Sequence, residues 1–257
     1  MSFFGSVTFL KSVASLEQAP ASAGEIAFAG RSNTGKSSAI NALIGRRLAH
    51  VSKTPGRTRL INYYALGAER FIVDLPGYGY ARVPDAVSAP WEELLGGYLR
   101  TRAPLRGLAV VMDVRQAVTE LDRRLLEWFR PTGKPVHVLL TKADKLSREA
   151  ARRILRQVES EVAALLPVPS VQLFSSLRNT GFEEAASVFR RWLGEEPSPP
   201  VGLADDSAKM ETPGKTGGLE IKTPGLKGEI SPGQNALRFK APRSGRRSGR
   251  RPKPSDG

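Results

Sequence analysis

The sequence contains no cysteine and no long apolar run. Without cysteine, neither a disulfide nor a thiolate-bound metal can form, which fits a reducing compartment. No apolar stretch approaches the roughly 18 residues that a helical membrane span needs. The first residues carry no basic stretch ahead of Phe3 and Phe4, so no signal peptide is predicted. We therefore expect a cytoplasmic protein that spans no membrane.

Acidic residues are in deficit along the chain. The 39 Lys and Arg outnumber the 25 Asp and Glu, which gives a formal net charge of +14 at pH 7. Residues 197–257 hold 12 basic and 6 acidic residues, a surplus of 6, so a surplus of 8 remains for residues 1–196. Such charge favours a polyanionic partner such as RNA, although it can also simply maintain solubility.

The composition changes near Gly194. Residues 197–257 contain 9 Pro and 10 Gly, and so few apolar side chains that burial cannot offset the entropy of ordering. We predict that 195–257 is a disordered basic tail. Its last part, 238–253, has eight basic residues and no acid, and could be an RNA-binding arm or an idle solvated segment.

Between residues 24 and 194, short apolar runs alternate with segments of helical periodicity. The predicted strands are 26–29, 60–66, 71–73, 107–112, 136–140 and 171–174, and the predicted helices are 39–45, 119–130, 148–166 and a last one ending at Gly194. Ser147 is the expected N-cap of the helix 148–166, and Thr180-Gly-Phe-Glu183 reads as a capping box for the last helix. This alternation predicts an α/β domain with a mainly parallel sheet, on which residues 1–23 pack as a lead-in strand or extension.

A complete Walker A pattern spans Gly30 to Ser37. It follows a predicted strand and opens a helix, which is the context that its function requires. The glycines let backbone N–H groups wrap around phosphate oxygens at the positive end of the helix. Lys36 is then placed to reach the β and γ phosphates, and the Ser37 hydroxyl to bind Mg²⁺.

Two further segments follow predicted strands. Asp74-Leu-Pro-Gly77 is a Walker B candidate, whose Gly77 N–H can meet a γ-phosphate. Thr141-Lys-Ala-Asp144 fits the [N/T]-K-x-D pattern, in which a carboxylate accepts both N1–H and N2–H₂ of guanine. Adenine offers no such donor pair, so this motif argues against an ATPase or nucleotide kinase. Ser175-Ser176 ends the next strand, where its backbone N–H groups would lie near guanine O6.

A second magnesium ligand is expected in the loop between residues 45 and 60. Thr58 follows Pro-Gly-Arg and could complete the Mg²⁺ shell when the γ-phosphate is present, so that ordering of this loop forms the switch. Thr54 is a rival ligand, although Pro55 restricts its backbone to extended conformations.

Taken together, these motifs resemble those of the YihA/YsxC/EngB group of bacterial GTPases, within the TrmE–Era–EngA–YihA–septin branch. The resemblance covers residues 24–194. It is carried by the segments Gly30-Arg-Ser-Asn-Thr-Gly-Lys-Ser37, Lys53-Thr-Pro-Gly-Arg-Thr58, Asp74-Leu-Pro-Gly-Tyr-Gly-Tyr-Ala81, Thr141-Lys-Ala-Asp144 and Phe174-Ser-Ser176. No additional module of the kind found in the relatives is visible, which favours the single-domain member of this branch. We also expect a monomer.

The resemblance implies a six-stranded G domain that binds GTP and GDP and hydrolyses GTP with Mg²⁺. It also implies a role in assembling the large ribosomal subunit, through contact with its precursor and rRNA, and a requirement for cell division and septation. The implied metal ligands are Ser37 and Thr58. The implied nucleotide contacts are Gly30, Arg31, Ser32, Asn33, Thr34, Gly35, Lys36, Ser37, Gly56, Arg57, Thr58, Arg59, Leu60, Asp74, Leu75, Pro76, Gly77, Thr141, Lys142, Ala143, Asp144, Phe174, Ser175 and Ser176.

Catalysis is expected to rest on Lys36, Asn33, Thr58 and Gly77. The position after Gly77, where many small GTPases have a water-orienting glutamine, is Tyr78, so slow intrinsic hydrolysis is expected. Asn33 resembles the asparagine that helps to hold K⁺ in some relatives, and either binds K⁺ here or only hydrogen-bonds the loop.

A different class of function is a division-site protein, in which GTP controls binding to septal components and ribosome contact is incidental. The basic surplus within residues 1–196 favours the ribosome-assembly switch over this alternative.

Overall fold

The computed structural model describes residues 4–49, 60–79 and 85–195, with the side chains of residues 85–92 left out. The predicted contacts Gly56, Arg57, Thr58 and Arg59, the rival Thr54 and the tail from residue 196 lie outside this description. The predicted domain limits therefore stay predictions.

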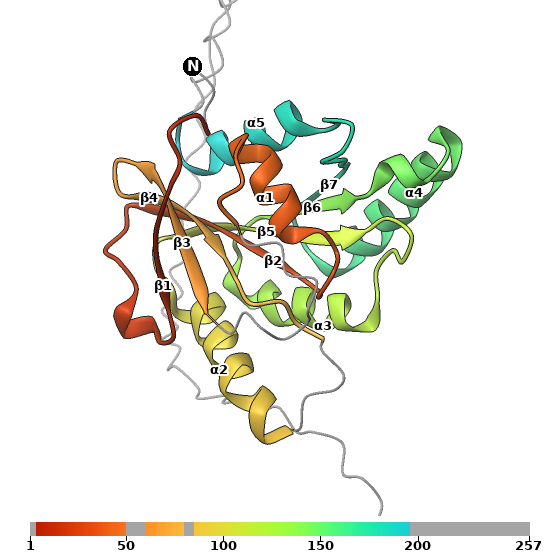
Figure 1. Cartoon of the computed structure of the whole chain (residues 1–257). Coiled ribbons are helices and arrows are strands. Elements are labelled where there is room, and N and C mark those ends of the chain that lie inside the picture. Colours follow the sequence, from red (N-terminus) through yellow and green to blue (C-terminus); the bar gives the residue numbers. More distant parts are fainter. Residues whose placement is uncertain (1–3, 50–59, 80–84, 196–257) are drawn as a thin grey trace, which may run out of the picture. The chain divides into compact units, whose positions relative to one another are not determined.

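A single sheet runs through the described domain (Figure 1). Its strands are β1 (Thr8–Val13), β2 (Gly24–Gly30), β3 (Ile61–Gly67), β4 (Arg70–Asp74), β5 (Leu105–Asp113), β6 (Val136–Thr141) and β7 (Pro169–Leu173). Their order is β1-β3-β4-β2-β5-β6-β7, and β4, β2, β5, β6 and β7 are mutually parallel. The prediction of a mainly parallel sheet is confirmed.

The predicted strand number of six is wrong, because the sheet has seven strands. The additional strand is β1, from the N-terminal segment, which pairs antiparallel with β3 and carries five exposed residues out of six. The sequence predicted this segment only as a lead-in strand or extension that packs on the domain. A strand with so little buried apolar surface has no alternating pattern that would place it in the sheet.

Helices cover both faces of the sheet. They are α1 (Lys36–Ile44), α2 (Asp85–Thr101), α3 (Glu120–Phe129), α4 (Arg148–Leu165) and α5 (Phe182–Trp192), with 3-10 turns at Leu16–Gln18, Arg130–Thr132 and Ala143–Lys145. One core holds buried residues of α1 and α5, and the core on the opposite face holds those of α2, α3 and α4 (Figure 1). Within the described ranges, no helix combines the length and apolarity needed to cross a bilayer.

Helix α2 was not predicted from the sequence. Pro90 and the pair Gly96-Gly97 lower its helical propensity, so its stability depends on packing. A Cβ at Gly96 would lie 2.2 Å from the Trp128 ring, which shows how closely α2 approaches α3. The C-terminal half of α2 is also fixed by buried Glu25 on β2, which accepts hydrogen bonds from the Tyr98 hydroxyl (2.6 Å) and the Arg102 guanidinium.

The helix caps agree with the sequence in one case and differ in another. Ser147 caps α4 by accepting a hydrogen bond from the Ala150 N–H at 3.2 Å, as predicted. The predicted capping box at Thr180 is wrong, because the N-cap of α5 is Gly181, with φ of 81° and no side-chain cap. Thr180 instead pairs its backbone with Ser175, with both N–H···O distances 3.1 Å, and so closes the loop after β7.

Candidate nucleotide-binding site

The Gly-rich loop joins the end of β2 to the start of α1. A Cβ at Gly30 would lie 2.8 Å from the Val111 carbonyl oxygen, and Gly35 has φ of 100°, so both positions favour glycine. Thr34 is buried and donates its hydroxyl to the Arg31 carbonyl at 2.8 Å, closing the turn. The backbone N–H groups of the Gly-rich loop and of the first turn of α1, which includes Lys36 and Ser37, form the kind of cradle that binds phosphate.

Asp74 lies at the carboxyl end of β4, beside the strand that leads into this loop. Asp74 is the register partner of Phe28 in β2, and its carboxylate contacts the Lys36 ammonium. The side chains of Lys36 and Asp74 are only 12% and 5% exposed, so the ion pair is largely withdrawn from water. The adjacent Leu75 is fully in the core, so only its backbone can face a ligand.

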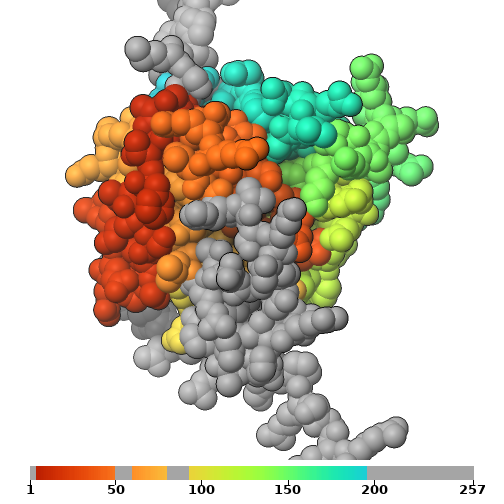
Figure 2. Space-filling view, viewed as in Figure 1, coloured from red at the N-terminus to blue at the C-terminus, as the bar shows by residue number. Residues whose placement is uncertain are grey.

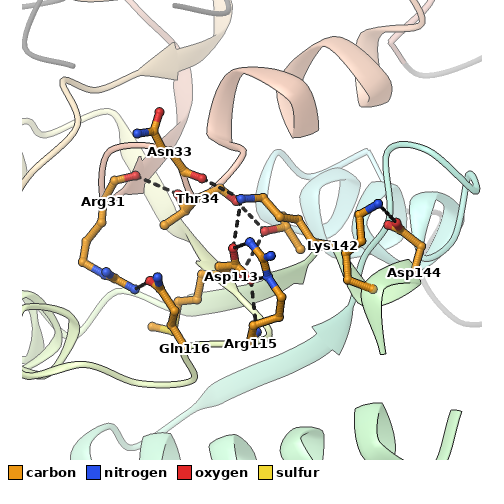
Figure 3. Close-up of polar contacts among 11 residues, drawn as sticks. Arg31, Asn33, Thr34, Asp113, Arg115, Gln116, Lys142 and Asp144 are labelled. Atoms are coloured by element: carbon orange, nitrogen blue, oxygen red, sulfur yellow. Dashed lines mark hydrogen bonds and ion pairs between the residues drawn. The ribbon is translucent and has the colours of Figure 1, made fainter. Parts of the chain in front are cut away.

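The Thr141–Asp144 segment supports the Gly-rich loop from the side. The Thr141 hydroxyl donates to the Thr34 carbonyl at 2.5 Å, and the Lys142 ammonium donates to the Asn33 carbonyl at 2.7 Å. The same ammonium contacts the Asp113 carboxylate at 2.9 Å (Figure 3). The segment that the sequence connects to base recognition thus also holds the phosphate loop in place.

Asp144 and Ser175 meet at the end of the site away from Asp74. The Ser175 hydroxyl donates to Asp144 Oδ1 at 2.6 Å, and this hydrogen bond lowers the pKa of the carboxyl group below its ordinary value. Asp144 is therefore an ionised acceptor at neutral pH. The Ser175 N–H is donated to the Thr180 carbonyl, which leaves the Ser176 N–H as the more available donor of the two.

Phe174 contributes through its backbone rather than its ring. Its carbonyl accepts from the Ala143 N–H at 3.2 Å, which joins the two loops of the base-recognition end. Its ring is buried and stacked on Phe182, with centroids 5.0 Å apart. Leu60, the one predicted switch-loop contact within the described residues, is an exposed side chain next to β3.

Sequence reasoning missed four polar residues that hold this site, all between the end of β5 and the first turn of α3. They are Asp113, Arg115, Gln116 and Asp122 (Figure 3 labels the first three). Burial acts to raise the pKa of Asp113, but hydrogen bonds from Arg115 and Lys142 outweigh it and hold that pKa well below the usual range. Asp113 directly follows the predicted central strand 107–112, the position where α/β folds place ligand-site residues, and that signal could have found it.

The matches to known proteins agree with this geometry. A family model described as "50S ribosome-binding GTPase" matches residues 25–142. "Probable GTP-binding protein EngB" of Dechloromonas aromatica (strain RCB) is 54% identical over 200 residues, which are 76% of this chain and 91% of that protein. Its counterpart in Methylobacillus flagellatus is 56% identical over 195 residues, 75% of this chain and 94% of the relative.

Solved structures show the same fold at lower identity. The crystal structure of a probable GTP-binding protein EngB has a TM-score of 0.54 and 22% identity, and covers 67% of this chain and all of that chain. Era in complex with MgGDPNP and nucleotides 1506–1542 of 16S ribosomal RNA has a TM-score of 0.55 and 22% identity, with 70% and 60% covered.

The fold and the loop at Gly30–Ser37 define a P-loop GTPase domain. At more than 50% identity over nine tenths of the length of its relatives, the chain belongs to the EngB family of GTP-binding proteins.

Proposed function

We propose that this chain is a magnesium-dependent GTPase that acts as a cytoplasmic switch in assembly of the large ribosomal subunit. The observation that carries the nucleotide part is the convergence of three segments on one edge of the sheet. The Gly-rich loop, Asp74 and the Asp144–Ser175 pair all follow the carboxyl ends of parallel strands, where α/β sheets bind ligands.

Guanine is the base that suits the far end of this site. Asp144 presents an ionised carboxylate, which can accept both the N1–H and the N2–H₂ of guanine, and Ser176 supplies an N–H for O6. Adenine would leave the carboxylate unpaired. Nucleotide contacts predicted at Gly56, Arg57, Thr58, Arg59 and Leu60 remain part of the proposal.

The oxygen donors at the phosphate end fit Mg²⁺. Ser37 lies in the first turn of α1, and the buried Asp74 carboxylate lies beside Lys36, so a hard cation would find one hydroxyl and one carboxylate nearby, for direct and water-mediated contact. We propose Ser37 and Thr58 as the direct ligands, with Asp74 acting through water. When bound, Mg²⁺ would neutralise charge on the β and γ phosphates.

Hydrolysis is proposed to be slow without a partner. Lys36 would hold the β and γ phosphates, Thr58 the metal and Gly77 the γ-phosphate, while Tyr78 cannot orient water as glutamine does. Asn33 is exposed, and within the described residues its side chain makes no hydrogen bond, so it is available for K⁺. Steady-state hydrolysis in K⁺ and in Na⁺ tests this, and equal rates would show that K⁺ does not stimulate hydrolysis.

RNA contact is supported by the solvent-facing side of α4. Arg148, Arg152, Arg153 and Arg156 are exposed and, within the described residues, none of them is in an ion pair. With about 100° of rotation per residue, Arg153 and Arg156 lie on the helix face opposite buried Ala151 and Val158, and Arg152 and Arg148 continue this face towards one side of the helix. Figure 2 shows the green surface of α4 at the edge of the domain opposite the red surface of β1. Free cationic groups of this kind bind phosphates with release of counterions.

Sedimentation with large-subunit precursor particles tests this proposal in the presence of a GTP analogue and of GDP. We expect nucleotide-dependent binding that weakens in Arg152→Ala/Arg156→Ala, with a salt slope reduced by about one for each arginine that contacts phosphate. Arg123→Ala/Arg124→Ala is the matched control, since those arginines are paired with Glu161 and Glu120. Equal binding to the particles with the GTP analogue and with GDP would contradict the proposed role as a switch.

The role in division and septation is proposed to follow from ribosome assembly. The alternative is a protein whose GTP state controls septal components directly. Depletion with ribosome profiles over time separates them, because an assembly defect that precedes filamentation supports the first and the reverse order supports the second.

A further inference from the structure

Asp122, in the first turn of α3, joins two segments that the nucleotide would contact. Its carboxylate is fully buried and accepts a hydrogen bond from the Tyr78 hydroxyl at 2.7 Å and one from Arg31 Nε at 3.2 Å. Thr119 adds its own N–H and hydroxyl, at 2.9 and 2.6 Å. Both carboxylate oxygens therefore accept hydrogen bonds, from Tyr78 and Arg31 of the site and from Thr119, the N-cap of α3.

Tyr78 follows directly on the Asp74-Leu-Pro-Gly77 segment and is paired with the Gly-rich loop. Its N–H donates to the Gly30 carbonyl and its carbonyl accepts from the Ser32 N–H, both at 3.3 Å. Gly77 packs on the same loop, since a Cβ there would lie 3.3 Å from Ser32 Oγ. The position of Gly77 is thus set by what holds Tyr78.

The Asp122 carboxylate also holds the Gly-rich loop, through Arg31. Arg31, the second residue of the Walker A pattern, also donates through Nη2 to Gln116 Oε1 at 2.7 Å (Figure 3). A Cβ at Gly79 would meet Leu121 at 2.6 Å, so the chain after Tyr78 lies tightly against α3 as well. Burial raises the pKa of the Tyr78 hydroxyl, which therefore stays protonated and remains a donor.

We infer that Asp122 is a positioning residue that, through the Tyr78 hydroxyl, holds Gly77 in place for the γ-phosphate. The inference rests on the proposed function, because it assigns a role in GTP binding to a residue outside the GTPase motifs. A buried carboxylate needs its donors, so loss of the hydroxyl loosens the segment between Asp74 and Tyr78. Binding of GTP then has to order that segment, which lowers the affinity for GTP. The affinity for GDP is affected less, because GDP has no γ-phosphate for Gly77 to contact.

Tyr98 provides a matched control. Its hydroxyl also donates to a buried carboxylate, Glu25, at 2.6 Å, but at the amino end of β2 and away from the loop. Tyr78→Phe and Tyr98→Phe therefore remove the same group from the same kind of contact. A role that is only structural would lower the melting temperature in both variants and leave nucleotide preference unchanged.

The experiment measures the affinities of the full chain and both variants for GDP and for a non-hydrolysable GTP analogue. We expect Tyr78→Phe to lower the affinity for the analogue relative to GDP by about three- to tenfold, and Tyr98→Phe to change that ratio less than about twofold. An unchanged or increased ratio in Tyr78→Phe, or an equal change in both variants, would overturn the inference. Absence of guanine-nucleotide binding by the unaltered chain would instead overturn the proposed function.

A second variant tests the route through Asp122. In an Asp122→Ala background the hydroxyl has no carboxylate to bind, so adding Tyr78→Phe should change the ratio no further. A full additional effect in the double variant would show that Tyr78 acts independently of Asp122.

Discussion

The Lys36 ammonium lies against the Asp74 carboxylate at the start of α1, in a largely buried ion pair. In the proposed function, Lys36 binds phosphate oxygens and Asp74 binds the water shell of the metal. Binding of Mg·GTP would then exchange this internal ion pair for two ligand contacts. The exchange keeps both charges compensated, which is the condition for holding buried charges at low free-energy cost.

Replacing Asp74 by Asn should uncouple nucleotide binding from magnesium. The neutral amide is a weaker partner for a metal-bound water, so we expect the affinity for GTP in Mg²⁺ to fall about tenfold. In EDTA, the variant should bind GTP at least as tightly as the unaltered chain, because Lys36 no longer has to leave a carboxylate, and this provides the internal control. Titrations with and without metal measure both values, and an undiminished effect of Mg²⁺ in the variant would contradict the proposed role.

Replacing Asp144 by Asn should change the preferred base. An amide accepts from N1–H and donates to a carbonyl at position 2, so xanthine suits it better than guanine. We expect a loss of GTP affinity of at least about tenfold and a gain for XTP, measured by competition. Ser175→Ala is the control: it removes the hydroxyl bonded to Asp144 but keeps the carboxylate, so GTP should still be preferred.

Replacing Thr141 by Val should weaken both nucleotides equally. The change removes the hydroxyl that reaches the Thr34 carbonyl in the Gly-rich loop and leaves the shape nearly the same. We expect a free energy of unfolding lower by about 1–2 kcal/mol and a several-fold loss of affinity for GTP and GDP alike. Thr101→Val removes an exposed hydroxyl bond within α2 and should do neither. A change in the GTP/GDP ratio would argue against a purely supporting role.

The buried imidazole of His137 predicts a pH dependence of stability away from the site. Burial lowers its pKa from 6.5 to about 4, and both ring nitrogens are bonded, to Ser170 and Gln172. The unfolded chain therefore binds a proton at a higher pH than the folded one, so stability is lost as pH falls from 6.5 towards 4. The loss amounts to about 3 kcal/mol at most.

Denaturant unfolding of the unaltered chain and of His137→Gln measures this contribution. The variant lacks the titrating group, so its stability should fall less over the same pH range. Parallel pH profiles of the two proteins would show that the imidazole does not contribute.

The sequence predicted those parts of the site that are built from contiguous residues. Gly30 to Ser37 and Thr141 to Asp144 each follow a buried strand, so their place at the edge of the sheet follows from the parallel topology. The sequence could not predict that Lys142 and Thr141 also bind loop carbonyls, because those contacts depend on tertiary distances. Asp122 was hidden for a similar reason: it looks like an ordinary residue in the first turn of a helix.

Helix α2 was missed, and strand β1 was predicted only as a lead-in strand or extension that packs on the domain, because both have weak local signals. Gly96 lowers helical propensity but is needed where α2 packs against Trp128, so tertiary packing outweighs local preference. Strand β1 is exposed on nearly every residue, so its pairing with β3 leaves no hydrophobic pattern to read. Thr180 is an element that the sequence predicted wrongly. Its sequence is typical of a capping box, but its backbone N–H and carbonyl are hydrogen-bonded to Ser175.

Magnesium-dependent binding of guanine nucleotides is tested by a calorimetric titration of the full chain with GTP and with ATP, each in Mg²⁺. We expect binding of GTP that is lost on removal of the metal, and an affinity for ATP at least about 100-fold weaker, because Asp144 would be left unpaired. Equal affinity for the two nucleotides, or binding of ATP alone, would contradict this expectation.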